Sequence, residues 1–227
     1  MQRSPRNARK TPAPSARRRL SPADRRRDLL RVAADLMTRK GVDGLQFAEV
    51  AAAAGVTRPL VYRFFESRQA LILAVLEDYA AELTERFGRG AMRSIPGSNA
   101  EVTRVFVEAV CDTIDTRGAG PWHLLDSKGP DPEIARRGQE IMDRLMTPWR
   151  LRLKEAVGVS HREASTLSRM IVAAGRAVLD LWCAGMLTRE EAVRDATRGV
   201  MALVEGFAHA HPSRARRARA AAGRRDG

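Results

Sequence analysis

The chain has 227 residues, a hydrophobic fraction of 44% and a formal net charge of +13. This length suits one compact domain, or two small ones that share a core, and the composition excludes a chain whose core depends on disulfides or metals. The only cysteines, Cys111 and Cys183, have neither a disulfide framework nor zinc-ligand spacing, which fits a reducing cytoplasm.

The positive charge is concentrated at the two ends of the chain. Residues 1–20 hold seven basic side chains and no acid, and residues 212–227 hold six arginines and one acid, which leaves residues 21–211 with a net charge of +1. Tails of this composition usually stay disordered. They attract polyanions without reading sequence, so we expect at least one tail to associate with nucleic acid; the alternative is a role in solubility alone.

No segment predicts a secretory signal or a membrane span. The basic N-terminus is not followed by the apolar stretch that a secretory signal needs. The most apolar run, residues 171–187, is short for a span and is interrupted by Arg176 and Asp180. We expect a buried helix there. Its two charged residues pair with each other or across a dimer axis, or, as a weaker alternative, contact a ligand.

Capping residues and apolar spacing predict the first two helices. Ser21 and Pro22 begin the first, and Gly41 ends it. The second carries apolar residues at i, i+3, i+4 and i+7 from Phe47 on one face and ends at Gly55.

The third and fourth helices follow closely. Thr57 is the expected cap of the third helix, and Pro59 falls in its first turn, where a missing N–H does little harm. Ser67 is the expected cap of a longer helix that runs to Phe87.

The second half of the chain also has helical spacing, with more interruptions. Residues 88–99 predict a connection, Phe106 marks a helix, and the stretches 118–121 and 127–132 mark breaks. A long helix bent near Pro148 follows, and two capping boxes, opened by Ser160 and Thr188, begin the last two helices. No segment alternates for long with a period of two, so we expect an all-α fold.

Residues 21–66 predict a helix-turn-helix domain, because the second and third helices are joined by a tight glycine turn. Ala51 is small enough to let the helices approach, and Gly55 permits the backbone conformation of the turn. The outer face of the third helix is then free to enter a major groove, N-terminal end first.

Four residues on that outer face have the chemistry for DNA contact. Arg58 and Arg63 are the expected base readers, and Thr57 and Tyr62 can donate to phosphate oxygens. The alternatives are a half-buried core aromatic at Tyr62 and solvated arginines at the other two positions.

This segment resembles the N-terminal signature of the TetR/AcrR family of transcriptional regulators. The resemblance rests on Gly41, on AEVAAAAGVTRPLVYRFF at residues 48–65 and on ESRQALILAVL at residues 66–76, and it covers roughly residues 21–83. The chain departs from the family pattern at Leu45 and Gln46, where a capping threonine or serine is common. It also departs from the pattern at Pro59 and Arg68.

The resemblance implies contact with double-stranded DNA. Pro59 replaces a common glycine, and Arg68 replaces a lysine but keeps its charge, so a phosphate contact is expected from Arg68 near the N-terminal amides of its helix. Gln46 is expected to cap weakly or to touch phosphate. The full set of expected DNA-binding residues is Gln46, Phe47, Thr57, Arg58, Pro59, Leu60, Tyr62, Arg63 and Arg68.

The resemblance also implies a linking helix at residues 67–87 and a domain at residues 88–211 that binds a small-molecule effector and pairs two subunits. The last two helices mix small and large apolar residues, which suits a four-helix interface between two chains; an ordinary intrachain core is the alternative. An expected pocket for a bulky apolar or cationic molecule, with plain core packing as the alternative, is lined by Phe106, Trp122, His123, Met142, Met146, Trp149 and Trp182.

These features predict a ligand-responsive, sequence-specific DNA-binding regulator, a repressor, that binds a palindromic site as a homodimer. We expect it in the cytoplasm, associated with the nucleoid. Catalytic residues, metal ligands and cofactors are not expected, because the histidines and cysteines lack ligand spacing and no phosphate loop follows a strand. The alternatives are a protein that coats DNA without sequence preference and an all-α small-molecule-binding protein or enzyme.

Overall fold

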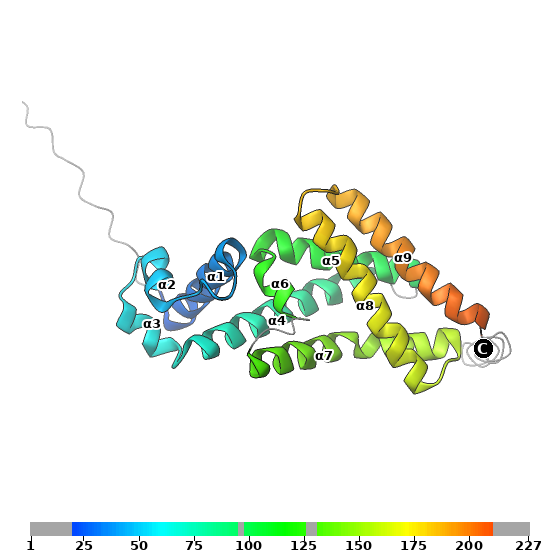
Figure 1. The fold of residues 1–227 in the computed structure, drawn as a ribbon, viewed down its shortest axis with the longest axis horizontal. Coiled ribbons are helices and arrows are strands. Elements are labelled where there is room, and N and C mark those ends of the chain that lie inside the picture. The colour runs from blue at the N-terminus through cyan, green and yellow to red at the C-terminus, as the bar shows by residue number, and fades with distance from the viewer. Residues whose placement is uncertain (1–19, 95–97, 126–130, 211–227) are drawn as a thin grey trace, which may run out of the picture.

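The computed structural model describes residues 20–94, 98–125 and 131–210, and within these ranges it holds nine helices and no strand (Figure 1). The all-α prediction is confirmed; the two basic tails lie outside the described residues, apart from Leu20. In chain order the helices are α1 Pro22–Lys40, α2 Phe47–Ala54, α3 Arg58–Phe64, α4 Arg68–Ser94, α5 Asn99–Arg117, α6 Gly120–Leu124, α7 Pro132–Val157, α8 His161–Cys183 and α9 Arg189–Ala210.

The molecule is elongated, with α1, α2 and α3 together at one end and α5 to α9 forming the rest (Figure 1). The long helix α4 begins beneath the three-helix end and runs into the larger part, where it packs against α5 and α7. Helices α8 and α9 pack on each other at the far side of the larger part. One continuous helix therefore belongs to both parts.

Side-chain caps begin the helices at the places that the sequence predicts. The Ser21 hydroxyl accepts from the backbone N–H of Asp24 at 3.1 Å, and Ser67 does the same for Ala70 at 3.0 Å. Ser160 and Glu163 form a complete capping box at the start of α8. Each cap satisfies an N–H that the first turn of a helix leaves unpaired, so these boundaries follow from local sequence.

Ion pairs tie α4 to its neighbours on both sides. From α5, the Arg117 guanidinium lies 2.9 Å from Asp78 and also pairs with Glu82 of α4. Burial opposes ionisation of Glu82, but hydrogen bonds from Arg86 and Arg117 outweigh it and lower the pKa of that carboxyl. From α7, Arg144 pairs with Glu77 at 2.9 Å.

The connection expected at residues 88–99 is largely wrong, because α4 continues to Ser94 and α5 begins at Asn99. Gly90 has a packing role: a Cβ built there would lie 2.5 Å from Cγ1 of Val105 on α5. The glycine thus reflects close approach of two helices and does not end α4. The break expected at 118–121 is replaced in part by the short helix α6, which starts at Gly120.

Gly90 and Gly88 offer a matched pair on one helix. Gly90→Ala is expected to destabilise the protein by about 1–3 kcal/mol, because the new methyl group collides with a stiff β-branched side chain. Gly88→Ala, where a Cβ meets no atom within 4 Å, is expected to stabilise it by up to about 1 kcal/mol. Urea unfolding of both variants measures the difference. Equal effects would contradict the close α4–α5 packing.

Candidate nucleic-acid interface and internal cavity

The corner between α2 and α3 is built on one left-handed glycine. Gly55 has φ 63° and ψ 38°, and the next residue, Val56, donates its N–H to the carbonyl of Ala51 at 2.9 Å. Val50 and Val61 are fully buried beneath the corner. Because a left-handed residue ends α2 and two valines fix the angle, α3 is held with its opposite face toward solvent. The predicted helix-turn-helix is confirmed.

The solvent face of α3 carries the residues predicted to contact DNA. Thr57, Arg58, Pro59, Tyr62 and Arg63 are exposed. Gln46 is exposed as well, and Leu60 is half-buried. Neither Thr57 nor Gln46 caps its helix with its side chain, so the expected side-chain caps do not form and both polar groups face water. The structure thus brings seven of the nine candidates to one surface.

Tyr62 is held upright on that surface by two neighbours. Its ring meets the buried Phe47 edge-to-face, with 4.7 Å between ring centroids. Arg58 donates from Nη2 to the Tyr62 hydroxyl at 3.1 Å and lies 5.5 Å from the ring centroid. Phe47 itself is 6% exposed and supports Tyr62 from below. Arg58 and Tyr62 are therefore pre-positioned, which lowers the entropy lost on binding.

Arg68 makes contacts inside the protein. Its Nε donates to the carbonyl of Leu45 at 2.8 Å, and its Nη2 donates to the carbonyl of Val42. These bonds fasten the turn between α1 and α2 to the first turn of α4. The expected phosphate contact of Arg68 stays a prediction. A phosphate there would be a third acceptor for a guanidinium that already donates to two backbone carbonyls.

Most arginines of α1 form ion pairs with acids, whereas those of α3 form none with the described residues. Arg25 pairs with Asp28 at 3.2 Å, and Arg39 pairs with Asp35 at 2.7 Å. Arg26 lies over the Phe65 ring, 5.4 Å from its centroid. By contrast, Arg63 makes no ion pair with any described residue. Arg58 and Arg63 of α3 therefore have no acidic partner among the described residues, although residues 21–211 are nearly neutral.

An internal cavity of about 40 Å³ lies between α4 to α9. Five of the seven predicted pocket residues line it, namely Phe106, Trp122, Met142, Met146 and Trp149. His123 and Trp182 do not; His123 is exposed, with Nδ1 3.5 Å from Asp180. Helix α8 also lines the cavity with Ile171, Val172 and Leu179, which were not predicted as pocket residues.

Arg176 is the one charged side chain among the described residues that line this cavity. Its Nη2 donates to the carbonyl of His123 at 2.9 Å, and its Nε lies 3.7 Å from Asp180, so the expected pairing along α8 is present. Its interruption of the apolar run marked it in the sequence, where contact with a ligand was the weaker alternative to pairing with Asp180.

A stripe of small and apolar residues is exposed along α8. Met170, Ala173, Ala177 and Leu181 recur at helical spacing on the solvent side, and Met170 and Leu181 are each 40% exposed. On α9, which packs against α8, a Cβ added at Gly199 or Gly206 would meet no described atom within 4 Å. This surface has the composition of a helix–helix contact, and the described part of the chain leaves it exposed.

The described residues hold no group of three or more histidines, cysteines or acids that could bind a metal ion. None of the helices in the described part of the chain is long and apolar enough to cross a bilayer. Burial raises the pKa of the Cys111 thiol to about 12, which keeps that thiol protonated and unreactive.

Comparison with known proteins agrees with this geometry. Residues 29–75, from α1 into α4, match the family of bacterial regulatory proteins called the tetR family. A curated relative, the HTH-type transcriptional activator FasR of Mycolicibacterium smegmatis, is 34% identical over 117 residues, which are 51% of this chain and 52% of the relative. The matched stretch thus spans about half the length of that relative.

Solved structures share the fold over most of the chain. A TetR-like transcriptional regulator from Rhodococcus sp. RHA1 superimposes with a TM-score of 0.65 and 21% identity, covering 82% of this chain and 96% of its own. A tetR-family transcriptional regulator from Streptomyces coelicolor gives a TM-score of 0.63 and 23% identity, covering 88% and 90%. At these identities the likeness shows the fold alone.

Two arginines near the corner separate a structural role from a surface role. Arg68→Met is expected to lower the free energy of unfolding by about 1–2 kcal/mol, because two backbone carbonyls lose a charged donor. Arg63→Met, at an exposed position without a described ion pair, is expected to change it by less than about 0.5 kcal/mol. Thermal and urea unfolding of the two variants measure both. Equal stabilities would mean that Arg68 does not hold the turn.

Proposed function

We propose that the chain, whose residues 29–75 match the tetR family of regulators, is a homodimeric, ligand-responsive transcriptional regulator of that family that binds a palindromic DNA site. The observation that supports this most is the exposed face of α3, where Arg58, Tyr62 and Arg63 stand over a rigid buried corner. The apolar cavity supports the response to a ligand, and the apolar surface stripe on α8 supports the homodimer.

At the DNA, each α3 enters a major groove with its N-terminal end leading. Arg63 and Arg58 read base edges, for which a guanidinium can form paired bonds to guanine. Thr57, Gln46 and Tyr62 donate to phosphates and fix the register.

Dimerisation buries the α8 stripe against its copy in a second subunit. A twofold DNA site requires a twofold protein, and the small residues Ala173 and Ala177 let two helices approach closely. The dimer then holds two α3 helices about 34–36 Å apart, one turn of DNA.

The effector signal reaches α3 along two helices that line the cavity. Helix α4 contributes Leu83 to the cavity and Arg68 to the corner. Helix α6 contributes Trp122, and the N–H of Gly120 at its start donates to the Thr38 hydroxyl of α1 at 3.0 Å. A ligand that binds only one arrangement of these helices shifts the dimer between DNA-competent and incompetent spacings.

We expect repression as the outcome of DNA binding. A dimer that covers promoter DNA needs no further surface to block transcription, whereas activation needs a contact with the transcription machinery. The relative FasR is named an activator. A reporter carrying the bound site upstream of a promoter decides the sign for this chain.

Selection of bound genomic fragments by the full chain at physiological salt tests the proposed function. A short palindrome is expected among the recovered fragments. Broad, steeply salt-dependent binding without any shared sequence would instead indicate a protein that coats DNA. Tight small-molecule binding without DNA affinity would indicate a carrier or an enzyme.

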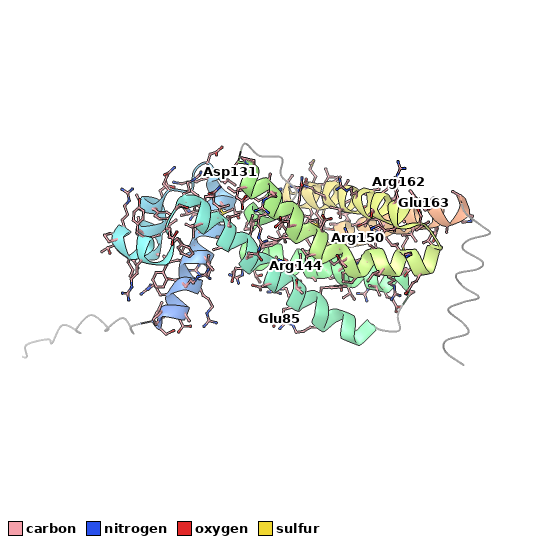
Figure 2. All side chains as sticks on the ribbon, turned by 90° about the horizontal axis from the view of Figure 1, so that it is seen from below. Glu85, Asp131, Arg144, Arg150, Arg162 and Glu163 are labelled. Carbon is pink, nitrogen blue, oxygen red and sulfur yellow. The ribbon has the colours of Figure 1, made fainter. Side chains whose placement is uncertain are left out.

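Removal of two α3 side chains tests the assignment of the recognition helix. The double variant Tyr62→Ala, Arg63→Ala is expected to lose at least about 30-fold in affinity for the selected site, since each lost contact costs about 1–3 kcal/mol. Arg162→Ala, an exposed arginine at the opposite end of the molecule (Figure 2), is the matched control and should bind as the parent does. Gel shifts measure both; unchanged affinity in the double variant would remove α3 from the interface.

A charge placed in the α8 stripe tests the dimer. Leu181→Glu is expected to yield a folded monomer that binds the selected site far more weakly, because a buried unpaired carboxylate opposes the interface. Leu151→Glu introduces the same charge at a leucine of α7 that is 60% exposed, and it should leave the dimer intact. Light scattering gives the mass of each. A dimeric Leu181→Glu variant would move the interface elsewhere.

A further inference from the structure

The walls of the internal cavity indicate which chemistry it accepts. We propose that the effector is a compact apolar molecule with a hydrogen-bond-accepting oxygen, neutral or acidic, whose oxygen is bound by the indole N–H of Trp122 or Trp149. This inference rests on the proposed function only in treating the cavity as the effector site.

Two tryptophans that line the cavity carry buried donors without an acceptor among the described residues. Trp122 and Trp149 are 5% and 4% exposed, and the Nε1 atoms of both are buried without a hydrogen-bond partner among the described residues. Buried indole N–H groups normally find a partner, because an unpaired donor loses its bonds to water without replacement. Both rings line the same cavity, so a small molecule that enlarges the cavity can reach an indole N–H and supply the missing acceptor.

The charge of the lining selects against cations. Arg176 is the one charged lining residue described, and no carboxylate lines the cavity in the described part of the chain. The guanidinium lies 5.9 Å from the centroid of the Trp122 ring, and a backbone carbonyl of α6 holds it there at 2.9 Å. Asp180 lies 3.7 Å from Nε of Arg176 and offsets part of its charge, but the guanidinium beside Trp122 still favours a carbonyl or carboxylate oxygen over an ammonium group. The cationic ligand expected from the aromatic and methionine residues is therefore not the one we propose.

The dimensions favour a compact molecule that enters between α7 and α8. The cavity of about 40 Å³ adjoins an outer hollow of about 170 Å³, and Met142, Met146 and Val172 line both. Arg150, labelled on α7 in Figure 2, lies at the outer hollow. Methionine side chains are unbranched and flexible, so the wall between the two spaces can yield to a ligand and enlarge the inner one.

Tryptophan fluorescence reports binding directly. The chain has three tryptophans, so Trp182→Phe leaves only the two that line the cavity. Four probes of similar shape are titrated without DNA at pH 7: acetylcyclohexane, cyclohexanecarboxylic acid, cyclohexylmethylamine and ethylcyclohexane. The ketone and the acid are expected to bind saturably and more tightly than the hydrocarbon, and the amine is expected to bind least.

Variants identify the donors. In the Trp182→Phe background, Trp122→Phe or Trp149→Phe is expected to weaken binding of the ketone about tenfold while that of ethylcyclohexane changes less than about twofold, because the variant removes a donor and keeps an aromatic ring. Arg176→Met should weaken binding of the acid more than that of the ketone. Circular dichroism checks that each variant is folded, and the two tryptophan variants test the donors independently.

Three results would overturn the inference. The first is binding of the amine as tight as that of the ketone. The second is unchanged binding of both the ketone and the acid in each of the two tryptophan variants. The third is absence of saturable binding by the ketone and the acid up to their solubility limits. Because no DNA is present, these results leave the DNA-binding proposal standing. Conversely, a failure to recover a palindrome leaves the ligand chemistry standing.

Discussion

A single buried face along α4 joins the two ends of this molecule. Leu71, Ile72 and Leu76 are fully buried in the first half of the helix, which packs on α1, and Leu83 lines the cavity farther along. Arg68 and Leu83 are fifteen residues apart, about 22 Å along a rigid helix. A shift of α4 at the cavity therefore has to be accommodated at the corner, since ion pairs to α5 and α7 hold its flanks. The placement of α3 depends on this constraint.

Local sequence was enough to predict the corner. The caps, the left-handed Gly55 and the buried valines act within a few residues of one another, so spacing alone indicates their geometry. Where a residue acts over distance, the sequence was insufficient. Arg68 donates to backbone carbonyls more than twenty positions earlier. Gly90 suggests the end of a helix in the sequence, but in the structure it lets α4 pack closely against Val105 of α5.

The cavity was predictable only in part, because its lining comes from helices that are distant in the sequence. Aromatic and methionine residues on α5, α6 and α7 marked five lining positions. The contribution of α8 was assigned to subunit packing, because an apolar helix does not reveal which of its faces turns inward. The helix uses both: Ile171 and Leu179 are buried, and Ala177 and Leu181 are exposed. Arg176, a charged residue inside the apolar run, was the local sign that one face of this helix does more than pack in a core. It also gives the cavity lining its charge.

The distance between the two α3 helices of a dimer tests the central claim most directly. A spin label at a cysteine introduced at exposed Ala53, near the end of α2, reports it in a Cys183→Ser background, where the remaining Cys111 is fully buried. With selected DNA bound, pulsed electron paramagnetic resonance should give one narrow distance that corresponds to α3 helices about 34–36 Å apart. Acetylcyclohexane should move the DNA-free distribution away from that value. No dipolar coupling, or a DNA-bound distance incompatible with one turn, would contradict a dimer whose α4 helices set the spacing of its recognition helices.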